Sequence, residues 1–201
     1  MLRVGLTGGL ASGKSFVGHA LESLGCHLIE ADELGHQVLL PGAEAYDAVV
    51  REFGPRILDP QGFIDRRKLA AVVFDKPALL EKLNGFVHPV VFARQDRMLA
   101  EFEKADPHGI AVVAAAIMVE TGSYKKLDRL VVAVCPLEQQ IERAMKRDSL
   151  TREEVMARIA RQLPLEEKVR LADFVIDTSG TKERTLEQVR VVYRSLRGIE
   201  A

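Results

Sequence analysis

The stretch from Gly5 to Ser15, GLTGGLASGKS, decides the fold, because its second half matches the phosphate-loop pattern G-x-x-x-x-G-K-[ST]. Glycines let the backbone curl so that successive N–H groups point toward phosphate oxygens, and the following helix adds the positive end of its dipole. We expect Lys14 to contact the β- and γ-phosphates of a nucleoside triphosphate, and the hydroxyl of Ser15 to bind Mg²⁺. The residues expected around the phosphates are Gly8, Gly9, Leu10, Ala11, Ser12, Gly13, Lys14, Ser15 and Phe16.

The sequence around this loop predicts an α/β fold, in which a parallel sheet of the P-loop NTPase type is flanked by helices. A short apolar strand enters the loop directly. An amphipathic helix leaves the loop and is expected to stop at Gly25. The expected strands are residues 2–6, 27–32, 110–119, 130–135 and 173–177.

Composition and charge are those of an ordinary globular protein. Apolar residues make up 47% of the 201, and the formal net charge is −1, so neither disorder nor attraction to nucleic acid or anionic membranes is expected. Cys26 and Cys135 lack metal-ligand spacing and are too few for a disulfide framework, which predicts two buried, reduced thiols. No apolar run is long enough to span a bilayer, and no signal-peptide pattern is present. We therefore expect a cytoplasmic protein, monomeric or weakly self-associating, with no nucleic-acid or membrane partner.

Residues 32–106 exceed what one crossover helix requires, and their periodicity predicts a small helical subdomain inserted into the sheet. His88-Pro89 interrupts the helical pattern, and the proline is expected to break a helix there because it restricts the residue before it. A structural role is the better interpretation of this histidine. Further breaks are expected at residues 41–46, 53–62 and 75–80.

A second excursion, residues 137–170, interleaves basic and acidic side chains. Thr151 and Glu154 form a T-x-x-E capping box, which predicts the start of a helix. Two interpretations of the arginines stay open. They form a solvated helix face, or they belong to a lid whose guanidinium groups neutralise charge on a transferring phosphoryl group. Arg143 and Arg147 lie one helical turn apart and can reach the same pocket.

Asp32 follows the second expected strand, at the sheet edge where open α/β proteins bind their ligands. Beside the phosphate loop, its carboxylate can accept the proton of an attacking hydroxyl or help to hold the metal. The segment ADELGHQVL also looks like a helix start, where Asp is a favoured N-cap. The pattern leaves both roles open, and they do not exclude each other.

Six stretches occur together along the whole chain: GLTGGLASGKS, EADELGHQVLLPG, FGPRILDPQGFIDRRKLAAVVF, LNGFVHPVV, RAMKRD and ADFVIDTSG. In this combination the sequence resembles the dephospho-coenzyme A kinase family. The phosphate loop alone is shared by many nucleotide proteins, whereas the combination is far more specific. The resemblance implies a nucleotide-binding core (residues 1–31, 107–136 and 171–201), a helical coenzyme A-binding insert (32–106) and a mobile lid (137–170).

The resemblance also implies transfer of the ATP γ-phosphate to the ribose 3′-hydroxyl of dephospho-coenzyme A, with Mg²⁺ as cofactor. This reaction is the last step of coenzyme A biosynthesis. Asp32 matches the proposed base of the family. The expected catalytic residues are Asp32, Lys14, Arg143 and Arg147. The residues expected at the acceptor site are Asp32, Arg66, His88, Pro89 and Glu120.

Three positions depart from the family pattern. Glu30 stands where an Asp-x-Asp pair often begins, and its longer side chain can alter a supporting contact. Residues 116–120, AIMVE, replace a Pro-Leu-Leu-Phe-Glu type of run, of which only Glu120 keeps the charged end. Thr178 stands where an Asn is frequent. A side-chain contact to adenine at this position is therefore in question, whereas a contact through the main chain of Thr178 is still possible.

Other classes of nucleotide protein share the loop. Nucleoside and nucleotide kinases also have an insert and a lid, and only the family-specific stretches argue against them. A GTPase switch would use DPQG at residues 59–62 as its D-x-x-G, but no convincing strand precedes it and no N-K-x-D is present. A non-catalytic nucleotide-binding module would bind ATP without releasing ADP for any acceptor.

Overall fold

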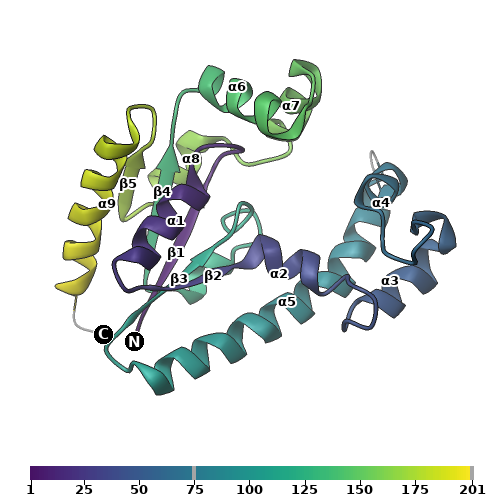
Figure 1. Ribbon diagram of the computed structural model, residues 1–201, viewed down its shortest axis with the longest axis horizontal. Helices are drawn as coiled ribbons and strands as arrows, with labels where there is room; N and C mark the ends of the chain where they lie inside the picture. Colours follow the sequence, from purple (N-terminus) through teal and green to yellow (C-terminus); the bar gives the residue numbers. More distant parts are fainter. Residues whose placement is uncertain (74–75, 200–201) are drawn as a thin grey trace. The chain divides into compact units, whose positions relative to one another are not determined.

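The computed structural model describes residues 1–73 and 76–199, and within them a five-stranded parallel sheet follows the order β2–β3–β1–β4–β5 (Figure 1). Every neighbouring pair of strands is parallel, so the predicted sheet is confirmed. The strands are β1 (Leu2–Gly8), β2 (His27–Glu30), β3 (Ile110–Ala114), β4 (Arg129–Val134) and β5 (Phe174–Asp177).

Helices connect these strands. The α-helices are α1 (Lys14–Ser23), α2 (Ala31–Gln37), α3 (Tyr46–Phe53), α4 (Arg66–Val73), α5 (Pro77–Ala105), α6 (Leu137–Asp148), α7 (Arg152–Ile159), α8 (Leu165–Arg170) and α9 (Lys182–Arg197). Two 3₁₀ turns, η1 (Pro55–Ile57) and η2 (Ser123–Lys126), complete the regular structure of the described residues. The chain forms two compact units, one of Met1–Glu30 with Glu101–Ala201 and the other of Ala31–Ala100.

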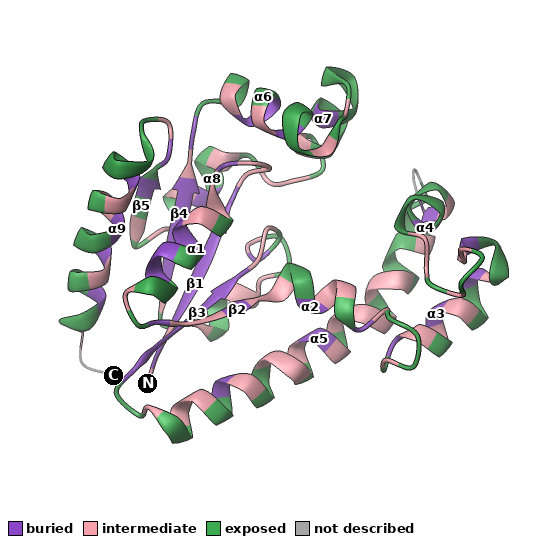
Figure 2. Ribbon diagram, viewed as in Figure 1, coloured by how far each residue is buried: buried purple, intermediate pink, exposed green. Residues whose placement is uncertain are grey.

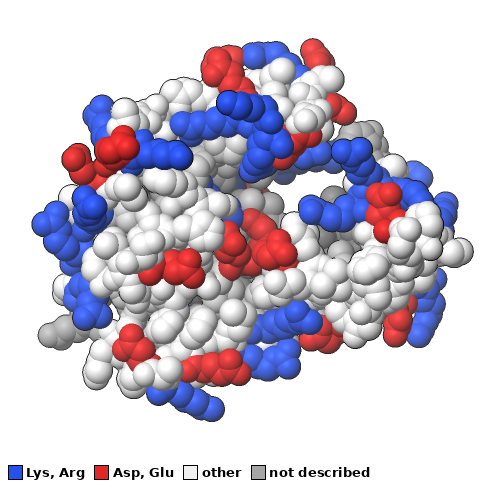
Figure 3. Space-filling view, in the orientation of Figure 1, with Lys and Arg blue, Asp and Glu red and all other residues white. Residues whose placement is uncertain are grey.

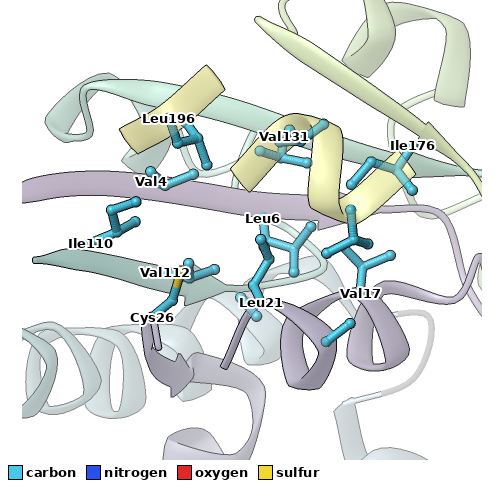
Figure 4. Close-up of a cluster of buried hydrophobic side chains, with 14 of the residues drawn as sticks. Val4, Leu6, Val17, Leu21, Cys26, Ile110, Val112, Val131, Ile176 and Leu196 are labelled. Atoms are coloured by element: carbon cyan, nitrogen blue, oxygen red, sulfur yellow. The ribbon is translucent and has the colours of Figure 1, made fainter. Parts of the chain in front are cut away.

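The core of the first unit lies between the sheet and the helices α1 and α9. Side chains of β1, such as Val4 and Leu6, pack against Val17 of α1 and Leu196 of α9, and all four are buried (Figure 4). The buried stripes of both helices face the strands, while their other faces are exposed (Figure 2). This burial of apolar surface from β1 and α1 fixes the two elements that carry the phosphate loop between them.

The expected strand at residues 110–119 is wrong in its second half. β3 ends at Ala114, and residues 116–122 form turns. The apolar residues after the strand cover the sheet instead of extending it. A Cβ atom at Gly5 would lie 2.6 Å from Sδ of Met118, which shows how closely this turn packs on β1. Because a buried turn and a buried strand both need apolar residues, the run alone does not separate them.

The second unit is helical and has a core of its own, made of Val49, Phe53, Ile57, Leu69 and Val73. The predicted breaks at residues 41–46 and 53–62 are confirmed, because α2, α3 and α4 are separate helices. Of the predicted break at residues 75–80, Asp75 lies outside the described residues, and α5 begins at Pro77.

The predicted break at His88-Pro89 is wrong, because α5 continues through Pro89. A proline inside a helix removes one hydrogen bond and costs about 3 kcal/mol. In a helix of 29 residues that buries Val91 and Leu99, one missing bond does not outweigh the remaining bonds and packing.

Candidate active site

The phosphate loop joins β1 to α1 as the sequence predicts. Two of its residues have positive φ angles, Ala11 at 54° and Gly13 at 87°, and α1 begins at Lys14. Alternation of left-handed and right-handed residues turns successive N–H groups toward one point, which makes an anion-binding concavity. Gly8 is required by space, because a Cβ atom there would lie 2.7 Å from the carbonyl oxygen of Ala133. The loop can therefore hold an anion at the positive end of α1.

Two of the loop's amides already have partners inside the protein. The N–H of Leu10 donates to Oε1 of Gln162 at 3.0 Å, and the N–H of Ser12 donates to the carbonyl of Gly9 at 3.1 Å. The main-chain N–H groups expected around the phosphates are thus used in part to hold the loop in shape.

Thr178, directly after β5, links the loop to α6. Its hydroxyl donates to the carbonyl of Ser12 at 2.7 Å and lies 3.2 Å from the carbonyl of Val134. Arg143 donates to the same hydroxyl at 3.2 Å and to the carbonyl of Thr178 at 2.8 Å. A Cβ atom at Gly13 would come within 3.0 Å of the Thr178 side chain. The residue that departs from the family pattern is therefore a buried support of the loop.

A pocket of about 400 Å³ opens beside the end of the loop, large enough for the ring system of a nucleotide. Phe16 and Arg143 both line it, and both residue types carry planar groups that stack on heteroaromatic rings. The lining residues are Gly13, Phe16, Arg143, Thr178, Gly180, Lys182 and Thr185.

Arg143 and Arg147 do not share a partner, although they lie one helical turn apart. Arg147 donates to both carboxylate oxygens of Asp148, at 2.8 and 2.9 Å, and its side chain is 59% exposed. The hydrogen bond from Arg147 holds the pKa of Asp148 below its ordinary value. Basic and acidic side chains also alternate over α6 and α7, at the top of Figure 3. Only Arg143 of the pair lines the pocket.

Glu120 is paired with a buried lysine from the mixed-charge segment of residues 137–170. Nζ of Lys168 lies 2.8 Å from Oε1 of Glu120 and donates to the carbonyl of Ala116 at 2.7 Å. The Lys168 side chain is 0% exposed and that of Glu120 is 20% exposed. Hydrophobic periodicity in the sequence does not predict the burial of Lys168, because α8 has only six residues, too few to show a buried face.

The remaining predicted site residues belong to the second unit. Asp32 lies in the first turn of α2, which begins at Ala31, so it is inside the helix and not the N-cap. Its strand β2 is separated from β1 by β3 and is not the direct neighbour of the phosphate-loop strand. Arg66 begins α4, where the carboxylate of Asp65 accepts from the N–H groups of the next turn.

His88 and Pro89 both lie inside α5. Partial burial lowers the pKa of His88, and its ring lies 6.0 Å from that of Phe92 in a tilted arrangement. This environment favours the neutral imidazole and agrees with the structural interpretation of the histidine.

Within residues 1–73 and 76–199, no helix combines the length and the apolarity needed to cross a membrane. The same residues hold no group of three or more His, Cys, Asp or Glu side chains that could bind a metal ion. Both cysteines are buried and free, as expected.

Comparison with known proteins gives consistent likenesses over nearly the whole chain. A family model described as dephospho-CoA kinase matches residues 2–183. The curated dephospho-CoA kinase of Aquifex aeolicus (strain VF5) is 39% identical over 196 residues, which cover 98% of each chain. Among solved structures, TT1252 from Thermus thermophilus is 29% identical over 96% of both chains, with a TM-score of 0.83. A dephospho-CoA kinase from Campylobacter jejuni is 27% identical over 97% of this chain and 96% of its own, with a TM-score of 0.71. These likenesses confirm the predicted P-loop kinase fold.

Proposed function

This chain belongs to the dephospho-CoA kinase family, and we propose from that premise that it transfers the γ-phosphate of ATP to the ribose 3′-hydroxyl of dephospho-CoA. The products are CoA and ADP. The observation that supports this most directly is the phosphate loop between β1 and α1, in a chain that matches the family model over residues 2–183. The phosphate loop and the pocket beside it support the binding of ATP, and membership of the family supports dephospho-CoA as the acceptor.

At the ATP end, the loop's main chain and Lys14 hold the phosphates. The concavity formed around Ala11 and Gly13 accepts the β-phosphate, and Lys14 is the first residue of α1, where the helix dipole also favours negative charge. The adenine ring takes the pocket between Phe16 and Arg143. Arg143 then lies at the boundary between base and phosphates, fixed by its two hydrogen bonds to Thr178.

Mg²⁺ fits the donor set of this site. It prefers a few protein oxygens, the phosphates and water, and needs no protein-only cage. The hydroxyl of Ser15, exposed in the first turn of α1, can supply one such oxygen, and no carboxylate cluster among the described residues competes for the ion. When bound, Mg²⁺ neutralises charge that develops on the transferring group.

At the acceptor end, Asp32 accepts the proton of the 3′-hydroxyl. Asp32 follows the last residue of β2 by two positions, so its Cα stays within about 7.6 Å of the carboxyl end of that strand. The Asp32 side chain is exposed in the first turn of α2, where its carboxylate oxygens can accept a hydrogen bond from an acceptor hydroxyl. Glu30, the longer acid before it, ends the strand.

The second unit binds the rest of dephospho-CoA, with Arg66, His88 and Pro89 in or near that site. Residues 137–170 act as the lid, and Arg147 exchanges its Asp148 partner for phosphate oxygens when ATP binds. Exclusion of water matters because water is itself an acceptor for the phosphoryl group. We also propose that the protein works in the cytoplasm as a monomer.

The test is a coupled assay of ADP release with dephospho-CoA, adenosine, AMP or no acceptor, in the presence of Mg²⁺. We expect rapid release only with dephospho-CoA, and a product that contains a new 3′-phosphate. Rapid release with AMP or adenosine would identify another nucleoside or nucleotide kinase. ATP binding without release for any acceptor would leave only a nucleotide-binding module.

The assignment of Asp32 needs its own variant. Asp32→Asn keeps the shape of the side chain and removes its basicity, so turnover should fall roughly 10²–10⁴-fold while the affinity for ATP stays within about twofold. Near-normal turnover of this variant would remove Asp32 from the mechanism.

A further inference from the structure

The hydrogen bond between Leu10 and Gln162 has no role in the mechanism above. Leu10 is the third residue of the phosphate loop, and Gln162 lies 152 positions later, between α7 and α8. The side chains of Leu10 and Ala11 also pack against the apolar cluster of α6 and α7, which contains Ile141 and Val155. The tip of the loop is therefore held by a polar contact and an apolar contact from the same segment.

The segment that carries Gln162 is itself anchored. The N–H of Leu163, the next residue, donates to Oε1 of Glu120 at 2.9 Å. The same carboxylate oxygen lies 2.8 Å from Nζ of the fully buried Lys168, which also donates to the carbonyl of Ala116. That carbonyl further accepts from the hydroxyl of Thr7 in β1 at 3.3 Å. These contacts therefore connect the segment of Gln162 to β1, the strand from which the phosphate loop emerges.

We propose that Gln162 is a positioning residue of the phosphate loop, and that the ion pair between the buried Lys168 and Glu120 keeps Gln162 in place. The carboxamide of Gln162 binds the Leu10 N–H and so sets the width of the cradle in which the remaining amides meet the phosphates. Glu120, expected from the sequence at the acceptor site, acts here through Leu163 and Lys168. The inference rests on the proposed ATP site, and ATP binding tests it without the phosphoryl-transfer reaction.

The Lys168 side chain is fully buried, and burial of a charge is expensive even when it is paired, so its pairing with the partly exposed Glu120 calls for a geometric reason. Removal of Glu120 would leave the buried charge of Lys168 without its carboxylate partner. A hydrogen bond from a main-chain N–H to a fixed acceptor has a direction, which dispersion contacts of Leu10 and Ala11 lack. The Lys168–Glu120 pair and the carboxamide of Gln162 therefore orient the main chain of the loop, which the apolar cluster cannot do.

The first variant is Gln162→Met, which keeps the length and volume of the side chain and removes the acceptor. The matched control is Asp128→Leu, which removes the acceptor of another main-chain N–H, that of Arg3 at 2.7 Å, at the opposite end of β1. Calorimetry with ATP and Mg²⁺ gives the affinity, and amide exchange followed by NMR reports on the Leu10 N–H directly.

For Gln162→Met we expect the Kd for ATP to rise about fivefold, the Leu10 amide to exchange at least tenfold faster, and kcat with dephospho-CoA to stay within twofold. A fivefold change corresponds to about 1 kcal/mol, the net value of one hydrogen bond. Asp128→Leu should leave the ATP affinity unchanged. A rise of less than threefold in Gln162→Met, or an equal rise in the control, overturns the proposal.

The ion pair is tested by the double variant Lys168→Met with Glu120→Gln, which removes both charges and keeps an acceptor for the Leu163 N–H. If the pair positions Gln162, the single variant Lys168→Met should weaken ATP binding at least threefold and accelerate exchange of the Leu10 amide. The double variant should recover part of the ATP affinity and part of the protection of the Leu10 amide against exchange. An unchanged ATP affinity in the single variant overturns the role assigned to the pair. Because both readouts need only ATP, they hold even if dephospho-CoA is not the acceptor.

Discussion

Replacement of Thr178 by valine should destabilise the phosphate loop, although the two side chains have nearly the same shape. The hydroxyl is lost, while a methyl group of similar size takes its place. Ser12, whose side chain is 0% exposed, loses the donor to its carbonyl, and Arg143 loses one of its two acceptors on Thr178. A buried carbonyl left without a partner costs about 1–3 kcal/mol, and the Arg143 bond at 3.2 Å adds little to this. We therefore expect a loss of about 2 kcal/mol in the free energy of unfolding.

For a chain of this length, 2 kcal/mol lowers Tm by about 4–8 °C. Urea unfolding followed by circular dichroism gives the free energy of unfolding. The ADP-release assay gives KM for ATP, which should rise because Ser12 and Arg143 both belong to the proposed ATP site. Thr178→Ser is the matched control, because it keeps the hydroxyl and removes only a methyl group. If Thr178→Val is as stable as Thr178→Ser and binds ATP as well, the hydroxyl does not support the loop and the reasoning is refuted.

Three further outcomes follow from the geometry. Gly8→Ala places a Cβ atom 2.7 Å from the carbonyl of Ala133, so we expect ATP binding to weaken at least tenfold, measured by calorimetry. Pro89→Ala supplies an N–H that can bind the carbonyl of Gly85, and should raise the free energy of unfolding by up to about 3 kcal/mol; a melt that shows no gain would contradict this. Burial raises the pKa of the Cys26 thiol to about 12, so at pH 8 it stays protonated and should not react with a disulfide reagent until the chain unfolds.

The sheet and the phosphate loop could be predicted from sequence because both depend on local pattern. β1 and α1 need only an apolar run, a glycine-rich turn and an amphipathic helix, which stand next to each other in the chain. The capping box of Thr151 and Glu154 is likewise local and is confirmed, with both of its hydrogen bonds present. The strand predicted at residues 110–119 was wrong in its second half, because an apolar run can form either a buried strand or a buried turn, such as the one after Ala114.

The contacts that stabilise the site could not be predicted in the same way. Lys168 looked like one charge among many in a mixed segment, and only the tertiary structure shows that it is buried beside Glu120. Thr178 appeared as a departure from a family pattern, and its hydroxyl proves to hold the carbonyl of Ser12. Both contacts join residues at least 48 positions apart. No local periodicity encodes such pairs.

The phosphate loop consequently depends on three distant segments for its shape. Thr178, directly after β5, contacts the end of the loop, and Gln162, in the segment before α8, contacts its tip. Gln140 of α6 packs over its second residue, because a Cβ atom at Gly9 would lie 2.4 Å from Oε1 of Gln140. A main-chain anion site binds tightly only if its amides are oriented before the ligand arrives, since ordering them on binding costs about 1–2 kcal/mol per residue. Because two of these supports come from residues 137–170, any movement of that segment changes the orientation of the amides, which couples the proposed lid to ATP affinity.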